Sequence, residues 1–257
     1  MENSEYRVMY NLEQSYWWFL GKQFLVRQSL RGLEIESSKC PRLLDIGCGT
    51  GIILKILEEF GSAWGMELSL QALKFLRERE VYKVVRGNAN ESLPFKDGTF
   101  SGITCLDVLE HLHNDSGLLR DMIRICKPGG RILITVPAFR FLWSPHDIAL
   151  HHKRRYTRVQ ILHQAEGLGC KVIKATYFNT ALFLPIMLLR KMRSHHSAGM
   201  RAQSDFFMGL PAPLNKILTR LYTLEVQCLR HLNFPFGVSL LVILEKRGRI
   251  EREPMMK

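Results

Sequence analysis

Short apolar segments alternate with amphipathic stretches through the middle of the chain. The apolar segments lie at residues 42–46, 63–67, 82–86, 101–106 and 131–136, and turn residues bound each of them, as expected for buried β-strands. Amphipathic stretches at 51–60, 69–79 and 115–126 have the spacing of helices that bury one face. This alternation predicts parallel strands joined by helices, and the segment KPGG predicts the stop between the last of these helices and the fifth strand.

The flanking segments have different patterns. Residues 5–32 suit one or two helices and contain the aromatic block SYWWFL. Thr157 is placed to cap a further helix, and residues 171–178 and 237–246 have the composition of two more strands. Between these two strands, residues 179–235 are apolar and basic, which predicts a helical insertion.

These elements together predict an α/β fold with a doubly wound, mostly parallel seven-stranded sheet, helices on both faces and a helical insertion before the last strand. A chain of 257 residues suits one large domain. We therefore expect a single domain over residues 1–257. In it, residues 1–38 form a helical lid, 39–178 and 236–247 form the core, and 179–235 form the insertion.

Charge divides the chain into two halves. Residues 1–139 hold 17 basic and 17 acidic residues, whereas residues 140–257 hold 19 basic and 7 acidic residues, which is the whole net charge of +12. This excess predicts an anionic partner for the second half: nucleic acid, a phospholipid surface or a phosphate-bearing substrate. Solubility alone is the alternative explanation.

Cysteine usage and hydropathy predict the compartment. The six cysteines form no C-x-x-C pair, which argues against a zinc site and against a disulfide framework. The polar start MENSEYRVMYNLEQ has no signal-peptide pattern, and no apolar run reaches the ~20 residues of a membrane span. We expect a cytoplasmic protein.

The segment LLDIGCGTG (43–51) places a glycine at every second position between a strand and a helix. Such glycines let a backbone approach a ligand closely. A Walker loop is excluded because Ile52 and Ile53 follow where lysine and serine or threonine are required. A dinucleotide fingerprint fits poorly, since Gly51 comes one position early. The pattern favours a small charged ligand without a pyrophosphate.

LLDIGCGTG resembles the first motif of class I S-adenosylmethionine-dependent methyltransferases. Glu67 ends the second predicted strand, where this family places an acid. Residues 87–112 resemble the family's block of third and fourth strands, and residues 125–137 resemble its fifth-strand block. The resemblance is close over residues 40–137, and it implies a Rossmann-like fold with S-adenosylmethionine as the cofactor.

The resemblance also implies how the cofactor is held. Glu67 would accept hydrogen bonds from the ribose hydroxyls, Asn88 and Ala89 would border the adenine, and Leu106 and Asp107 would meet the ammonium group of the amino-acid tail. The implied cofactor-binding residues are Asp45, Gly47, Cys48, Gly49, Gly51, Glu67, Leu68, Asn88, Ala89, Leu106 and Asp107.

Methyl transfer to an oxygen or nitrogen also requires removal of a proton, and histidine is the usual base near neutral pH. His111 follows the fourth predicted strand, and His146, His151 and His152 follow the fifth, at the sheet edge where ligands bind in open α/β folds. We take His111, His146 and His151 as the catalytic candidates. A structural role is the alternative for each of them.

Asp107, Glu110 and His111 match the E-x-x-E-H set of ubiquinone-pathway O-methyltransferases, some of which use a divalent cation. Here aspartate, one methylene shorter, replaces the first glutamate, and an acid near a helix start has an ordinary electrostatic explanation. Two carboxylates and an imidazole would hold magnesium only loosely, so we predict a site without metal.

The segments YWWFLGK (16–22) and HDIALHHKRRYT (146–157) resemble a subgroup often encoded near bacterial glycan and lipid-carrier genes. This resemblance implies that Trp17 and Trp18 cover the bound cofactor. It also implies that Arg154, Arg155 and Tyr156 grip a phosphate or carboxylate of the acceptor. Simple packing of the aromatic helix and a solvated basic turn are the alternatives.

The insertion begins with the apolar run TALFLPIMLLRKMR, which suits an interfacial helix with basic flanks. We therefore expect methyl transfer to an oxygen of a small or lipid-linked acceptor, with peripheral contact to an anionic membrane. A capping subdomain or dimer interface is the alternative for the insertion. A nucleic-acid methyltransferase is disfavoured, because LDVLEH is not the Asp/Asn-Pro-Pro-aromatic clamp of base-modifying enzymes. A non-catalytic partner or sensor that binds the cofactor is a further alternative.

Overall fold

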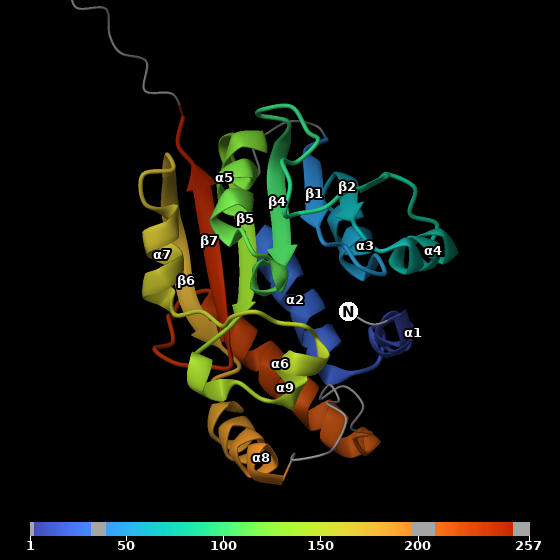
Figure 1. Ribbon diagram of the computed structural model, residues 1–257, viewed down its shortest axis with the longest axis vertical. Coiled ribbons are helices and arrows are strands. Elements are labelled where there is room, and N and C mark those ends of the chain that lie inside the picture. Colours follow the sequence, from blue (N-terminus) through green and yellow to red (C-terminus); the bar gives the residue numbers. More distant parts are fainter. Residues whose placement is uncertain (1–2, 32–39, 197–208, 249–257) are drawn as a thin grey trace, which may run out of the picture.

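The computed structural model describes residues 3–31, 40–196 and 209–248, and a seven-stranded sheet runs through its centre (Figure 1). The strand order is β3-β2-β1-β4-β5-β7-β6. Strands β1 to β5 are parallel, whereas β7 is antiparallel to β5 and to β6. The strands are β1 (Arg42–Ile46), β2 (Ser62–Glu67), β3 (Val84–Arg86), β4 (Phe100–Leu106), β5 (Cys126–Pro137), β6 (Cys170–Phe178) and β7 (Ser239–Lys246). The predicted sheet is thereby confirmed.

Helices cover both faces of this sheet. The helices are α1 (Asn3–Leu12), α2 (Trp17–Arg31), α3 (Ile52–Glu58), α4 (Leu70–Glu78), α5 (Asp115–Ile125), α6 (Pro145–Ala149), α7 (Arg158–Ala165), α8 (Phe183–His196) and α9 (Ala212–Leu229), with short 3-10 turns η1 (Leu109–His111) and η2 (Arg140–Leu142). Helices α5 and α7 contribute to one core cluster, and α2, α3 and α9 contribute to the other. Because side chains alternate along β1, Leu43 lies in one cluster and Leu44 and Ile46 lie in the other.

Most element positions follow the sequence pattern, with two differences. The third strand is shorter than expected, at Val84–Arg86. The fifth strand begins at Cys126 instead of 131, so the KPGG segment lies inside it, next to an irregular register against β4. A helix does end just before this segment, at Ile125, as predicted.

The predicted insertion contains α8 and α9, separated by residues that lie outside the described part of the chain. Helix α9 packs along α2, and the Asn215 side chain accepts a hydrogen bond from the Trp17 backbone N–H at 2.9 Å. The Tyr222 ring lies so close to Gly21 that a Cβ atom there would be 2.0 Å from Tyr222 Cδ1. Helix α9 therefore packs closely against α2 and stabilises its position.

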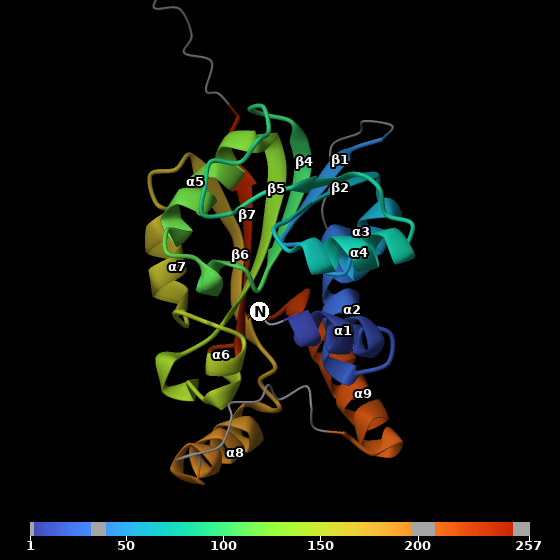
Figure 2. The same ribbon diagram turned by 45° about the vertical axis from the view of Figure 1, so that its right-hand side comes forward.

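The parallel strands point toward the end of the molecule where α1, α6 and α8 lie (Figures 1 and 2). Helix α1 contacts α4 and, with α2, covers the loops that leave β1 and β2. We call α1 and α2 the roof. Among the helices of the described residues, none combines the length and the apolar character of a membrane-crossing segment.

Candidate functional site

A cavity of about 370 Å³ lies beneath the roof, at the carboxyl ends of the parallel strands. Open α/β sheets bind their ligands at this edge. We call the part lined by the roof, by the loops after β1, β2 and β3 and by the end of β4 the first half of the cavity. We call the part lined by η1, α6 and the segment that follows α6 the second half. The residues relevant below that line the cavity are Trp18, Lys22, Gly47, Gly49, Glu67, Leu68, Asn88, Ala89, Leu106, Asp107, Glu110, His111, His146, His152, Arg155 and Arg190.

The glycine loop after β1 has the left-handed backbone that its composition predicts. Gly47 has φ +70, and a Cβ atom there would lie 2.5 Å from Val108 Cγ2. Gly51 has φ +92, and a Cβ atom there would lie 2.4 Å from Leu76 Cδ2. Residues with a side chain rarely adopt this backbone, so glycine is required both for the turn and for the close packing.

Glu67 connects the loops that line the first half of the cavity. Its carboxylate accepts hydrogen bonds from the N–H groups of Gly49 at 2.9 Å, Leu68 at 2.8 Å and Ser69 at 2.8 Å. The side chain thus ties the glycine loop to the turn that begins α4. Glu67 lines the cavity, and its binding to the ribose hydroxyls stays a prediction.

Three predicted cofactor residues lie behind the cavity lining. Asp45 is buried and accepts a hydrogen bond from the Thr104 hydroxyl at 2.6 Å, and burial raises its pKa to about 7. Cys48 is buried, with a pKa that burial raises well above its ordinary value, and Gly51 packs on α4. These residues can shape the loop, but they are outside the set that lines the cavity.

A buried ion pair fastens the roof to the glycine loop. Glu13, 3% exposed, follows α1 and binds the Arg79 guanidinium, with Nη2 2.6 Å from Glu13 Oε2. The Thr50 hydroxyl of the glycine loop donates to the same carboxylate oxygen. Met9 of α1 also lies against Gly49, 3.0 Å from the position of a Cβ atom. One carboxylate therefore connects the roof, the loop and α4.

Lys22 of α2 reaches into the cavity and forms an ion pair with Asp107 at the end of β4. The other Asp107 oxygen accepts a hydrogen bond from the Thr135 hydroxyl at 2.9 Å. Burial acts to raise the pKa of Asp107, but the Lys22 ammonium and the Thr135 hydroxyl outweigh it and hold this pKa below its ordinary value. The sequence analysis missed Lys22, because nothing local links it to a residue 85 positions away.

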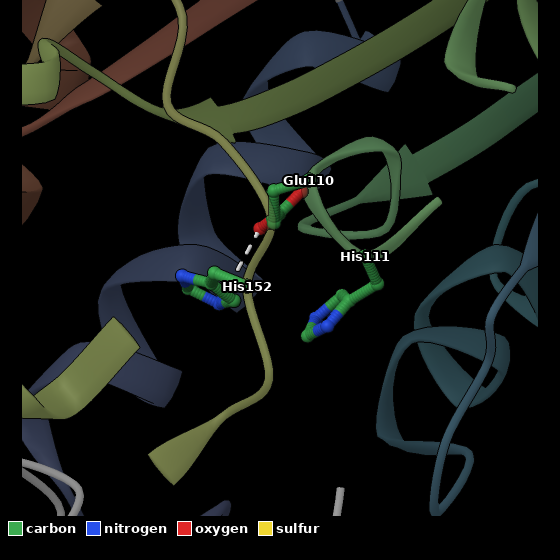
Figure 3. A group of neighbouring side chains, drawn as sticks. All are labelled: Glu110, His111 and His152. Carbon is green, nitrogen blue, oxygen red and sulfur yellow. Dashed lines mark ion pairs between the residues drawn. The ribbon is translucent and has the colours of Figure 1, made fainter. Parts of the chain in front are cut away.

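Glu110, His111 and His152 converge in the other half of the cavity (Figure 3). Glu110 is fully buried, neither carboxyl oxygen has a hydrogen-bond partner, and burial together with the nearby Asp107 raises its pKa well above the ordinary value. Burial and the neighbouring His152 lower the pKa of His111 to about 4. Near neutral pH, His111 is therefore a neutral imidazole, and burial favours the protonated form of Glu110.

His152 lies between two acidic side chains. Its Nδ1 is 2.8 Å from Asp147 Oδ1, and its Nε2 is 3.9 Å from Glu110 Oε1. Asp147 is fully buried and also accepts hydrogen bonds from Arg155 Nε at 2.8 Å and Nη2 at 2.9 Å. Burial opposes ionisation, but His152 and Arg155 outweigh it and hold the pKa of Asp147 well below its ordinary value.

The structure separates the three histidines predicted to act in catalysis. His111 and His146 line the cavity, and the His146 ring lies 6.1 Å from the His152 ring. His151 is exposed, has φ +58 and does not line the cavity. It alternates with His152, so the turn that directs one side chain inward directs the other to solvent.

The predicted acceptor-binding residues also differ from expectation. The Arg154 guanidinium pairs with Asp115 at 2.9 Å, and the buried Tyr156 hydroxyl donates to the same carboxylate at 2.7 Å. Neither residue lines the cavity, because Asp115 at the start of α5 holds both side chains away from it. Arg155 does line the cavity, but its guanidinium is bound to Asp147 and to the Ala138 carbonyl oxygen.

The two predicted lid tryptophans have different surroundings. Trp18 lines the cavity, and the Lys22 ammonium lies 5.5 Å from the centre of its ring. Trp17 is buried and packs against the Tyr222 ring of α9, with ring centres 6.1 Å apart. The packing alternative therefore describes Trp17, and only Trp18 faces the cavity.

Glu110, His111 and His152 offer ligand atoms within 4.8 Å of one another, and their residue types can bind divalent cations. The nearby charges are already paired, however: Lys22 pairs with Asp107, Arg155 pairs with Asp147, and burial favours the protonated form of Glu110. A dication would therefore gain little net attraction from these acidic groups. The absence of a metal accordingly stays a prediction, and these charges favour it.

The match to a known family includes residues from both halves of the cavity. Residues 44–134 match the family model described as a methyltransferase domain. This segment runs from β1 to β5 and includes the glycine loop, Glu67, Asp107 and Glu110. Lys22, Asp147 and His152 lie outside it.

Two curated relatives and one solved structure illustrate the similarity. Norajmaline N-methyltransferase of Rauvolfia serpentina is 33% identical over 175 residues, which cover 63% of this chain and 58% of that protein. Ubiquinone biosynthesis O-methyltransferase of Alkalilimnicola ehrlichii is 33% identical over 116 residues, covering 43% of this chain and 45% of that protein. The match spans less than two thirds of either relative. A SAM-dependent methyltransferase from Archaeoglobus fulgidus superposes with a TM-score of 0.56 at 22% identity, covering 87% of this chain and 94% of the other.

Proposed function

We propose that the chain contains a class I methyltransferase domain. We infer that it transfers a methyl group from S-adenosylmethionine to a hydroxyl oxygen of a small or lipid-linked acceptor. The observation that carries this proposal is the cavity at the carboxyl edge of the sheet. Its first half brings the left-handed glycine loop together with Glu67 and, after β4, Asp107, and its second half brings two histidines together with the buried acid Glu110.

The first half fits the cofactor. Gly47 and Gly49 present backbone to the cavity without side chains, as the close approach of a charged amino-acid tail requires. Glu67 Oε2 accepts one hydrogen bond, from Gly49, so this oxygen retains capacity for the ribose hydroxyls. Asn88 and Ala89 line the same half, next to Leu68. When bound, the cofactor supplies an electrophilic methyl carbon on a sulfonium.

The second half supports an oxygen acceptor. A hydroxyl group must lose its proton as the oxygen is methylated, and neutral imidazoles can accept that proton. His111 is neutral near pH 7, because burial and His152 lower its pKa to about 4. Burial favours the protonated form of Glu110, and in this form its carboxyl group can donate a hydrogen bond to the same oxygen.

Exposed apolar side chains on α8, on α9 and after β5 support a lipid-linked acceptor at an anionic membrane. On α8, Leu184 and Leu188 are 60% and 58% exposed, and on α9, Ile217 and Leu224 are 54% and 57% exposed. Phe141, which follows β5, is 63% exposed. Together with the excess of basic residues after residue 139, these side chains suit an interfacial position.

Calorimetry with adenosylhomocysteine tests the cofactor proposal. We expect measurable binding, and we expect Glu67→Ala to weaken it at least about tenfold, because a buried acceptor for two hydroxyl groups is lost. Glu166→Ala, which removes an exposed carboxylate after α7 and outside the cavity lining, is the matched control. No binding by the unmodified protein, or equal binding by Glu67→Ala, would refute the proposal.

Labelled S-adenosylmethionine tests the acceptor. The full-length protein is incubated with separate lipid, quinol and glycan fractions from the source cell, and label in an alkali-stable ether is the expected product. Flotation with vesicles of phosphatidylcholine and phosphatidylglycerol tests the membrane contact at low salt. Cofactor binding without transfer to any fraction would instead favour the non-catalytic partner or sensor.

A further inference from the structure

His152 is fixed from both sides by backbone hydrogen bonds. Its own N–H donates to the Asp147 carbonyl oxygen at 2.9 Å, and the next N–H, of Lys153, donates to the Glu110 carbonyl oxygen at 2.8 Å. The imidazole is therefore held at the junction between the segment that follows α6 and the η1 turn.

Asp147 is itself immobilised. The Ser144 backbone N–H donates to Asp147 Oδ2 at 2.9 Å, and Arg155 adds two hydrogen bonds through its guanidinium. Because this carboxylate is ionised, both oxygens only accept, and the hydrogen on His152 Nδ1 is donated to Oδ1. The proton of the neutral imidazole then resides on Nδ1, and Nε2 presents a lone pair.

His152 and Glu110 both line the cavity, and the dashed line in Figure 3 joins the His152 imidazole to the Glu110 carboxylate. The 3.9 Å from Nε2 to Glu110 Oε1 is too long for a direct hydrogen bond. An oxygen atom placed to one side can nevertheless lie within hydrogen-bond distance of both atoms. The two unpartnered oxygens of Glu110 are consistent with a ligand that completes their bonding.

Resting on the proposed function, we propose that His152 is the catalytic base for a hydroxyl acceptor, that Asp147 is its positioning residue, and that Glu110 orients the acceptor oxygen. The acceptor hydroxyl gives its proton to His152 Nε2 while its oxygen forms the bond to the methyl carbon. The C–S bond breaks and leaves its electron pair on sulfur, as a neutral thioether. The imidazolium is stabilised opposite the Asp147 carboxylate until Nε2 releases the proton to solvent.

The other histidines fit this role less well. The His111 ring packs at 75° to His152 with 4.8 Å between ring centres, and its lowered pKa makes it a weaker base. The centre of the His146 ring lies 6.1 Å from that of His152, farther than the His111 ring, and His151 is exposed outside the cavity. Charged groups that face His152 are Asp147 and Arg155 on its own segment, Glu110 from η1, and, across the cavity, Asp107, Lys22 and Arg190.

Nitrogen NMR of the imidazoles tests the geometry without an acceptor. The full-length protein carries ring-labelled histidine, is saturated with adenosylhomocysteine and is dialysed against a chelator, so that no cation can occupy Nε2. His152→Gln assigns the signals. We expect the proton of neutral His152 on Nδ1 and an unprotonated Nε2, and a shift of this preference in Asp147→Asn. A proton on Nε2 in the unmodified protein would overturn the proposal.

Label transfer tests the role of the base. The probe is whichever lipid, quinol or glycan fraction accepts label from the unmodified protein. His152→Gln should lower the rate about 10²–10⁴-fold and abolish its increase with pH, while adenosylhomocysteine affinity stays unchanged. His163→Gln, an exposed histidine on α7, is the matched control and should behave as the unmodified protein.

The possible outcomes separate the two proposals. If His152→Gln transfers label at the unmodified rate and with the same pH dependence, the assignment of the base is overturned. If the unmodified protein binds adenosylhomocysteine but labels no fraction, the proposed transfer fails, and the NMR experiment still decides whether Asp147 sets the His152 tautomer.

Discussion

Replacing Arg79 by methionine should destabilise the protein much more at pH 8 than at pH 5. The Arg79 and Glu13 side chains are 6% and 4% exposed and lie 2.6 Å apart. Loss of one partner from a buried ion pair costs about 3–5 kcal/mol, because the remaining charge is left uncompensated. Glu13 is ionised at pH 8, since burial raises its pKa only to about 6, so we expect the full cost there.

At pH 5 the same substitution should cost less. The pKa of Glu13 rises from 4.5 to about 6 on folding, which corresponds to about 2 kcal/mol. The folded state therefore binds this proton more tightly than the unfolded chain, and its relative stability increases as the pH falls from about 6 to about 4.5. Without Arg79, a protonated Glu13 leaves no buried charge, and we expect the cost to fall by at least about 1–2 kcal/mol.

Urea unfolding midpoints at both pH values measure the difference. Arg27→Met is the matched control, because Arg27 pairs with the exposed Glu59 and its loss should cost less than about 1 kcal/mol. The double variant Glu13→Gln/Arg79→Met should lose its pH dependence. An equal cost of Arg79→Met at pH 5 and pH 8, or a cost below about 1 kcal/mol at pH 8, would refute the reasoning.

Three further substitutions have expected outcomes. Lys22→Met should lower the free energy of unfolding above about pH 4, because Lys22 holds the pKa of Asp107 below its ordinary 3.8. In the unmodified protein the stability from this ion pair is lost only as the pH falls through the lowered pKa, and urea unfolding midpoints at pH 3 and pH 7 measure the difference. Gly47→Ala should reduce adenosylhomocysteine affinity at least tenfold in calorimetry, since the new methyl would lie 2.5 Å from Val108. Gly21→Ala should destabilise the fold by about 1–3 kcal/mol through overpacking against α9, measured by urea unfolding.

The first half of the cavity was largely predictable because the sequence patterns that indicate it are local. Alternating apolar segments give the order of strands and helices, and glycines between Leu43 and Gly51 mark the turn where the backbone must be left-handed. The acid at the end of β2 is a fixed distance along the chain from that turn. Each signal lies within about 25 residues, so neither long-range contacts nor side-chain direction was needed to find it.

The second half of the cavity was not predictable in the same way. Arg154, Arg155 and Tyr156 are adjacent, yet Asp115 binds the first and third while Asp147 binds the second. A basic and aromatic cluster alone cannot show which side chains are already paired. The choice of His152 over His151 likewise depends on one backbone turn with φ +58. The five-residue spacing from Asp147 to His152 was the available signal.

The last strand along the chain, β7, lies between β5 and β6 in the sheet. During synthesis, β5 and β6 consequently leave the ribosome with unpaired edges that only residues 239–246 can join. Exposed edges invite pairing with other chains, so premature termination before residue 239 should yield an aggregation-prone product instead of a smaller folded unit. Variants shortened from the carboxyl terminus would need to retain this strand.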